Sequence, residues 1–291
     1  MPELPEVETV RKGLADRLVD FSIAHLEVCR SRVIASPGGP KEFKGQMIGS
    51  KVGRWHRRGK YLLACLNRDD ANSSDRANRL IDAGWWGVHL RMTGQFQWHE
   101  VAIPACSHTR VRFWNGEGKE LRFVDTRSFG QMWWVPPGIS PEKIITGLQK
   151  LGPEPFSKDF NPNYLKQQLK GKTRPIKSAL LDQSLVAGAG NIYSDESLFE
   201  AGILPQKPSG QLKETEIERL CSSLIEVLKI SIGKGGTTFS DFRNLEGHNG
   251  NYGGQAWVYG RSNKPCRKCG STIQRENLSG RSTHWCPNCQ K

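Results

Sequence analysis

The stretch CRKCGSTIQRENLSGRSTHWCPNCQ, residues 266–290, holds four of the eight cysteines of the chain in two C-x2-C pairs. The segment between the pairs is long enough for a β-hairpin, with β-branched residues on both sides of a Leu278-Ser279-Gly280 turn. Such a hairpin brings four thiolates into a tetrahedron around Zn²⁺, which predicts a zinc ribbon with one structural ion. Two disulfides are the alternative, which a basic cytoplasmic protein disfavours. The predicted zinc ligands are Cys266, Cys269, Cys286 and Cys289.

The composition of the 291-residue chain is strongly basic. Lys and Arg number 42 against 29 Asp and Glu, a net charge of +13. A solvated basic surface would explain this excess, but a sequence pI of about 9.5 favours a polyanionic partner, and we expect nucleic acid. No run of 18 apolar residues is present, so we expect no membrane span and a cytoplasmic protein.

The first part of the chain predicts a β-sandwich with one helix packed on it, over residues 1–135. The helix is expected at 5–18, because Val7, Val10, Leu14 and Leu18 repeat at spacings of three and four. Several short runs with β-strand character follow it. They span residues 22–28, 61–67, 85–92, 110–114, 121–126 and 130–135, with residues 86, 88, 90 and 92 on one face and a polar loop expected at 67–79.

The stretch PPGISPEK, residues 136–143, marks a change to helical character. Apolar residues at helical spacing predict a helical domain over 136–234. Its helices are expected at 161–170, 176–188, 191–202 and 215–233.

A glycine-rich turn, VAGAGN, leads into the helix expected from Asn191, and its N-terminus fits either a phosphate site or a plain packing corner. Residues 235–260 are also rich in glycine and contain aromatic side chains. They form either a linker or a mobile lid before the ribbon domain at 261–291.

Pro2 is hard to explain as a structural residue. Proline suits the first turn of a helix, which accounts for Pro5 but not for Pro2. Once Met1 is removed, Pro2 is a secondary amine with a pKa of roughly 8. Its attack on an aldehyde carbon gives an iminium, an electron sink for β-elimination. Glu3 and Glu6 are close enough in sequence to move protons, although acidic residues also favour helix N-termini through the helix dipole.

Eight motifs in order along the chain resemble formamidopyrimidine-DNA glycosylase. They are PELPEVETV (2–10), RRGKYLL (57–63), HLRMTG (89–94), DTRSFG (125–130), LGPEP (151–155), AGAGNIYSDESLF (187–199), VYGR (258–261) and the four-cysteine ribbon. The resemblance implies an α+β multidomain fold: an N-terminal β-sandwich with an N-terminal helix, a helix–two-turn–helix domain and a C-terminal zinc ribbon. It also implies a monomeric repair enzyme acting on damaged double-stranded DNA, which removes oxidised purines and cuts the strand by β,δ-elimination.

The resemblance also assigns catalytic roles. Pro2 matches the nucleophile that attacks C1′ of the damaged nucleotide, and Glu3 matches the acid/base that helps to open the sugar. Lys60 matches the proton donor of β-elimination, and Arg281 matches the arginine of δ-elimination. The carboxylates with a candidate supporting role are Glu6 and Glu196.

A further set of residues resembles the DNA contacts of the family. Met92, Arg127 and Phe129 match a wedge that fills the space left by the extruded base. The segment 235–256 corresponds to a lid over that base. The residues that match backbone contacts are His108, Lys172 and Asn191.

The sequence departs from the family pattern at three places. Ser128 stands where many members have a second arginine, the polar loop is longer than usual, and an extra residue in KTRPIK displaces Lys172 by one or two positions.

Two other functions are alternatives to an oxidised-purine glycosylase. An endonuclease VIII type enzyme for oxidised pyrimidines usually has glycine where Leu4 stands here. A zinc-ribbon DNA-binding protein without chemistry would have no use for Pro2 and Glu3.

Overall fold

The computed structural model describes residues 1–70, 80–237 and 250–291, and these residues divide into two compact units. The first unit contains residues 1–2, 6–70, 80–149 and 250. The second contains residues 3–5, 150–237 and 251–291. The start of the chain is therefore shared, with Glu3 belonging to the second unit.

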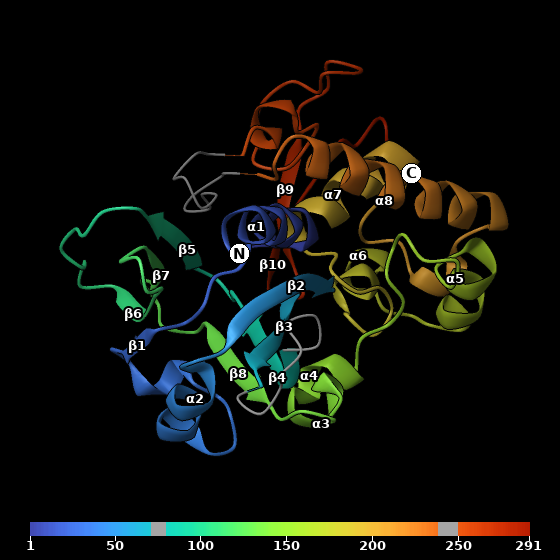
Figure 1. The fold of residues 1–291 in the computed structure, drawn as a ribbon. Helices are drawn as coiled ribbons and strands as arrows, with labels where there is room; N and C mark the ends of the chain where they lie inside the picture. Colours follow the sequence, from blue (N-terminus) through green and yellow to red (C-terminus); the bar gives the residue numbers. More distant parts are fainter. Residues whose placement is uncertain (71–79, 238–249) are drawn as a thin grey trace. The chain divides into compact units, whose positions relative to one another are not determined.

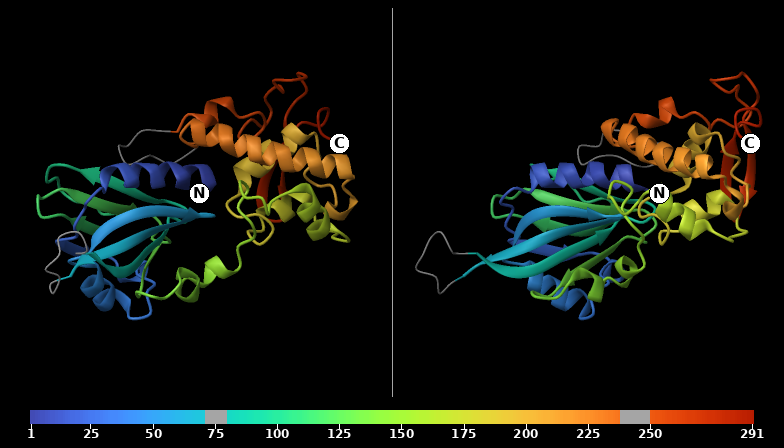
Figure 2. Two further views of the ribbon diagram at one scale, coloured as in Figure 1. Left: turned by 45° about the vertical axis from the view of Figure 1, so that its right-hand side comes forward. Right: turned by 90° about the vertical axis from the view of Figure 1, so that its right-hand side faces the viewer.

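The described part of the first unit is built on two four-stranded antiparallel sheets (Figures 1 and 2). One sheet has the order β1 (His25–Val28), β6 (Thr109–Trp114), β7 (Glu120–Asp125) and β5 (Gly94–His99). The other has the order β2 (Lys51–Arg58), β3 (Tyr61–Asp69), β4 (Leu80–His89) and β8 (Gln131–Val135). The helices of this unit are α1 (Leu4–Arg17), α2 (Gly39–Met47), α3 (Pro141–Ile144) and α4 (Thr146–Gln149), with a 3-10 turn at Ser31–Val33.

One hydrophobic core joins the two sheets and α1. Trp86 of β4 lies 4.6 Å from Phe113 of β6 between ring centroids, so aromatic side chains from the two sheets meet in the interior. The predicted apolar face of α1 is buried in the same core, with Leu14 fully buried. The β-sandwich with a packed first helix is confirmed.

The predictions for the first unit missed several elements. The strands β2 and β5, the helices α2, α3 and α4 and the 3-10 turn at Ser31–Val33 were not expected as separate elements, because they are short or contain few apolar residues. Of the polar loop expected at 67–79, residues 67–69 extend β3 and residues 71–79 lie outside the described part.

The strand expected at 85–92 ends at His89, which was a wrong boundary. The backbone turns at Arg91, whose φ is +55°, and the main-chain N–H of Arg91 donates to Nδ1 of His89 at 2.9 Å. Met92 is therefore not a core residue continuing the buried face of Trp86 and Val88, since 36% of it is exposed.

The second unit is helical, with a two-stranded ribbon at its end (Figure 1). Its helices are α5 (Pro162–Leu169), α6 (Ile176–Leu181), α7 (Asn191–Ala201) and α8 (Glu214–Gly233), with 3-10 turns at Ser209–Gln211 and Tyr252–Gln255. The apolar faces of these helices share one core, which includes Leu4. None of the helices in the described part of the chain combines the length and the apolar character needed to span a bilayer.

The helix expected at 176–188 ends at Leu181, seven residues early. The side chain of Asp182 accepts hydrogen bonds from the main-chain N–H of Ser184 at 3.0 Å and from its hydroxyl at 2.6 Å. Such a local turn competes with helix propagation, so the apolar residues after position 182 pack from a loop.

The ribbon consists of β9 (Gln274–Leu278) and β10 (Arg281–Trp285), paired in antiparallel register with Leu278 opposite Arg281. Ser279 and Gly280 form the turn, and both have positive φ, as a tight two-residue hairpin requires. The predicted hairpin between the cysteine pairs is confirmed.

We expect Leu14→Ala to destabilise the first unit by about 2–5 kcal/mol, because it opens a cavity between α1 and the sheets. Denaturant unfolding followed by tryptophan fluorescence measures this, since seven of the nine tryptophans lie before residue 150. The matched control is Val19→Ala, just after α1, where the side chain is 70% exposed. Its effect should stay within about 0.5 kcal/mol, and equal losses in both variants would contradict the packing described.

Candidate functional site

The carboxylate of Glu3 closes the N-terminus of α7. It accepts hydrogen bonds from the main-chain N–H groups of Ile192 at 3.0 Å and of Tyr193 at 3.5 Å, and only 2% of Glu3 is exposed. Free N–H groups and the helix dipole make this end of a helix a site for negative charge. The sequence left open a phosphate site or a packing corner here. The structure places the carboxylate of the chain itself on these two N–H groups.

Two glycines before α7 allow this close approach. A Cβ atom at Gly190 would lie 2.3 Å from Cδ of Glu3, and one at Gly188 would lie 2.6 Å from Cδ1 of Leu4. The main-chain N–H of Leu4 also donates to the carbonyl of Gly188 at 3.1 Å. The two glycines of the AGAG motif are thus required because the side chains of Glu3 and Leu4 pack directly against them.

Pro2, the expected nucleophile, is buried, and Met1 before it is about half exposed. Glu6 lies in the first turn of α1, with 2% of it exposed. Both carboxylates that the sequence places near Pro2, those of Glu3 and Glu6, are therefore buried.

Lys60 lies in the tight turn between β2 and β3, next to Gly59, whose φ is +55°. Only 7% of Lys60 is exposed, so it is not the ordinary surface lysine that a basic strand would provide. Burial, with the charges of Arg91 and Lys60 nearby, lowers the pKa of His89 to about 3. His89 is therefore neutral at physiological pH and can accept the N–H bond that shapes the turn before Met92.

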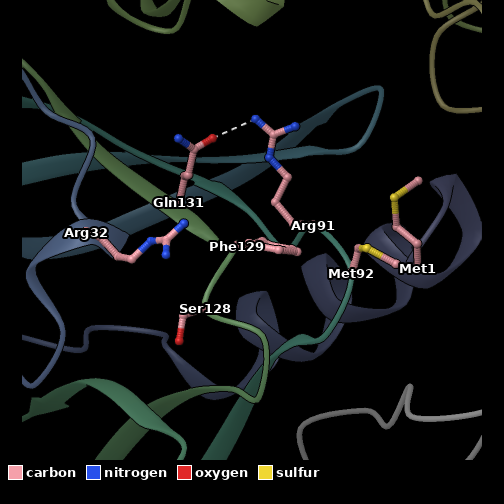
Figure 3. Close-up of a pocket in the computed structure, with 7 residues that line it drawn as sticks. All are labelled: Met1, Arg32, Arg91, Met92, Ser128, Phe129 and Gln131. Atoms are coloured by element: carbon pink, nitrogen blue, oxygen red, sulfur yellow. Dashed lines mark hydrogen bonds between the residues drawn. The ribbon is translucent and has the colours of Figure 1, made fainter.

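Met92 and Phe129 line one pocket of about 440 Å³ in the first unit (Figure 3). Both side chains are partly exposed, at 36% and 42%. The guanidinium of Arg127 lies over the ring of Phe129 at 4.9 Å, so the three expected wedge residues come together. The other lining residues are Met1, Arg32, Arg91, Ser128 and Gln131.

Asp125 holds the two chain segments that contain Met92 and Phe129. The sequence indicated this residue only as part of the DTRSFG motif. Its fully buried carboxylate accepts hydrogen bonds from Thr93 Oγ1, from the main-chain N–H of Arg127 at 3.2 Å and from that of Gly130 at 2.7 Å. It therefore ties the segment after Met92 to the loop that contains Phe129. An aspartate at the end of a strand was the available signal.

Arg281 begins β10 and is exposed. The side-chain amide of Asn191 donates to the carbonyl of the next residue, Ser282, at 2.9 Å. The structure thus brings Asn191 to the ribbon beside Arg281.

Glu196 of α7 is fully buried and holds the connector that leads to the ribbon. Its carboxylate accepts the main-chain N–H groups of Trp257 at 2.7 Å, Val258 at 2.9 Å and Tyr259 at 2.8 Å. Burial raises the pKa of this carboxyl group, while the three N–H donors act in the opposite direction. The VYGR motif is thus bound through its backbone to an α7 side chain.

The remaining expected backbone contacts are exposed. His108 lies just before β6, with Nδ1 3.3 Å from a guanidinium nitrogen of Arg110. Lys172 lies in the turn between α5 and α6, where its carbonyl accepts the N–H of Gly210 at 2.8 Å. Of the expected lid, residues 238–249 lie outside the described residues.

The four ribbon cysteines fit a zinc ion. Their sulfur atoms all lie within 4.8 Å of one another, and the Sγ–Sγ distances are 4.0 Å for Cys266–Cys289 and 3.4 Å for Cys269–Cys286. A tetrahedron with Zn–S bonds of about 2.3 Å has S–S edges of about 3.8 Å, whereas a disulfide is far shorter. Four thiolates leave no open position for water, so this ion is structural.

Family models match nearly the whole chain. The formamidopyrimidine-DNA glycosylase N-terminal domain matches residues 1–132, and the formamidopyrimidine-DNA glycosylase H2TH domain matches residues 151–243. The zinc finger found in FPG and IleRS matches residues 263–291. With the cysteine geometry, this last match establishes one structural zinc and confirms the predicted ligand type.

Individual proteins of the same family also match this chain over its full length. The formamidopyrimidine-DNA glycosylase of Prochlorococcus marinus (strain MIT 9313) is 69% identical over the full length of both chains. A Lactococcus lactis FPG mutant in complex with Fapy-dG containing DNA has a TM-score of 0.87, and the wild-type L. lactis FPG with an oxidised pyrimidine containing DNA has 0.86. Each is 34% identical, with all of both chains covered. The motifs, the fold and these full-length matches show that the chain belongs to the formamidopyrimidine-DNA glycosylase family.

Proposed function

We propose that this protein is a bifunctional base-excision repair glycosylase that removes 8-oxoguanine and formamidopyrimidines and then cuts the strand by β,δ-elimination. The observation that supports this most directly is the placement of Glu3 on the N-terminus of α7, immediately after Pro2. A DNA-binding module without chemistry has no need for a buried carboxylate beside an N-terminal secondary amine.

In the proposed reaction the Pro2 nitrogen, freed by removal of Met1, attacks C1′ and the damaged base leaves. Glu3 assists by moving a proton to the ring oxygen as the sugar opens. The resulting iminium carries a positive charge without a further proton, and it makes the hydrogen on C2′ acidic. The two N–H groups that hold Glu3 fix the position of its carboxylate for this transfer, as general acid–base catalysis requires.

Lys60 and Arg281 act in the two elimination steps, Lys60 as proton donor for the loss of the 3′ phosphate and Arg281 for the loss of the 5′ phosphate. The burial of Lys60 in its tight turn restricts the lysine side chain to few conformations, which suits a group that must meet one phosphate. Glu6 and Glu196 support the site, Glu196 by holding the connector before the ribbon.

Met92, Arg127 and Phe129 insert where the damaged base leaves the stack. Extruding a base costs a few kcal/mol, and partly exposed apolar side chains can replace part of the lost stacking. Arg127 faces the orphaned cytosine, and His108, Lys172 and Asn191 contact the DNA backbone. For Asn191 this contact would be made beside the bond to Ser282.

We also propose that the protein acts as a monomer on chromosomal DNA in the cytoplasm. An L. lactis relative is solved with an oxidised pyrimidine containing DNA, so oxidised pyrimidines are a second candidate substrate class. Leu4 is fully buried and packs tightly against Gly188. The endonuclease VIII type usually has glycine at this position, so the two N-termini differ here.

Borohydride trapping on a duplex with 8-oxoguanine opposite cytosine tests the nucleophile. We expect one covalent adduct, which peptide mass spectrometry places on the Pro2 amine, with Met1 absent from the protein. The same trapping experiment on a duplex with an oxidised pyrimidine compares the adduct yield for the second candidate substrate class. An adduct on a lysine, or none on a protein that lacks Met1 and still binds the duplex, would rule out the proposed chemistry.

Glu3→Gln should reduce base removal at least ~100-fold and leave duplex binding close to native, because the amide keeps one acceptor for α7 but cannot transfer the proton. Single-turnover base release and a binding titration measure the two effects. Glu8→Gln is the matched control: Glu8 lies in α1, five residues after Glu3, where it pairs with Arg11 at 2.8 Å, and it should leave both quantities unchanged. Native base release by the Glu3 variant would exclude Glu3 from the reaction.

Cys286→Ser should lower zinc content, duplex binding and strand cleavage together, since the ribbon that presents Arg281 depends on the ion. Metal analysis, a binding titration and a cleavage assay follow the three properties. Cys106→Ser, at an exposed cysteine outside the ribbon, should alter none of them. If the zinc-free ribbon variant cleaved DNA normally, the ribbon would not take part in the reaction.

A further inference from the structure

A buried ion pair, to which no role has been assigned above, joins two helices of the second unit. Nζ of Lys177, on α6, lies 2.7 Å from Oδ1 of Asp195, on α7. The side chains are 1% and 0% exposed, so neither charge has access to solvent. Burial lowers the pKa of Lys177, and the nearby Asp195 acts in the opposite direction.

Both members of this pair also bind β10. Nζ of Lys177 donates to the carbonyl of Ser282 at 2.7 Å and to Oγ1 of Thr283 at 2.9 Å. Oδ2 of Asp195 accepts the main-chain N–H of His284 at 2.9 Å and lies 3.3 Å from its Nδ1. Three consecutive residues of the strand are therefore bound to one ion pair.

The residue just before these three is Arg281. Its side chain is exposed, while Thr283 and His284 are buried. Ser178 of α6 lies 3.0 Å from Ser279 of the hairpin turn between hydroxyl oxygens, which adds a contact on the other side of Arg281. Arg281 thus extends to solvent between residues 282–284, which are bound to the ion pair, and Ser279, whose hydroxyl contacts α6.

Stability alone does not require such a pair. Desolvation of two charges offsets most of their attraction, and apolar residues of similar volume often stabilise a core equally well. What a buried ion pair with hydrogen bonds provides is geometry, because short directional bonds fix the strand in one register and position.

We infer that Lys177 and Asp195 are positioning residues for Arg281: they hold β10 on α6 and α7 so that the guanidinium meets the 5′ phosphate in the δ-elimination step. This rests on the role of Arg281 in the proposed function. In this inference the pair acts on Arg281 through its bonds to residues 282–284 and takes no part in the chemistry.

The test uses the zinc-loaded full-length Lys177→Met/Asp195→Asn variant, which removes both charges and so leaves none buried without a partner. On a duplex with a preformed abasic site, we expect the ratio of β-product to β,δ-product to rise at least ~10-fold, since small misplacements of a catalytic group cost large factors in rate. Base release from 8-oxoguanine and borohydride trapping should remain near native. Hydrogen exchange of the peptide covering residues 281–285 should become faster.

The matched control is Arg122→Met, which breaks an equally buried ion pair with Glu120 (2.8 Å) in β7 of the first unit. It should change neither the product ratio nor exchange in β10. If the Lys177/Asp195 double variant fails to fold, Lys177→Arg carries the same two measurements, because it keeps the charge and alters the donor geometry.

An unchanged product ratio in the zinc-loaded variant overturns the inference, provided that Arg281→Ala itself suppresses δ-elimination. If Arg281→Ala leaves δ-elimination intact, the proposed role of Arg281 has failed. Hydrogen exchange of the Lys177/Asp195 double variant then tests separately whether the ion pair positions β10. Faster exchange in β10 supports this, and native exchange overturns it.

Discussion

The structure of the site depends on a carboxylate placed at a helix N-terminus. Two N–H groups at the start of α7 have no partners within the helix, and Glu3 satisfies them from the beginning of the chain. This contact lies within the second unit and fixes the residue beside Pro2. It also explains why the preceding segment is glycine-rich, since any side chain at Gly190 would occupy the space of the carboxylate.

The same helix organises the rest of the second unit. Asp195 binds the ribbon strand, and the next residue, Glu196, binds the connector before the ribbon. Burying two adjacent acidic residues is costly unless hydrogen bonds satisfy them, and here main-chain N–H groups supply those bonds. One helix thus binds Glu3, the ribbon strand and the connector before the ribbon.

Much of this arrangement could be predicted from local patterns. The C-x2-C spacing gave the ribbon hairpin, and the 3–4 spacing of Val7, Val10 and Leu14 gave the buried face of α1, because ligand spacing and helix period are local properties. The motifs identified the family and with it the helix–two-turn–helix domain. The end of the helix at Leu181 was missed because one side chain, Asp182, overrides the apolar pattern.

The polar interior was the part that the sequence did not reveal. Lys177 meets Ser282 across 105 positions, and Asp195 meets His284 across 89. No period or propensity encodes pairings of that range, and a buried lysine looks in sequence like any other lysine in a basic chain. His89 and Asp125 were overlooked as separate residues for a related reason, since their importance lies in the turns that they hold.

The contacts of α7 with residues far apart in the sequence have a consequence for when the protein can fold during its synthesis. The N-terminus of this helix is completed by the third residue to be synthesised, and its buried acids are satisfied by residues 257–259 and 284. Until residues 257–259 and 284 have been synthesised and have reached α7, Glu196 and Asp195 lack the main-chain N–H groups that bind them. The native packing of the second unit therefore forms only after that part of the chain has left the ribosome.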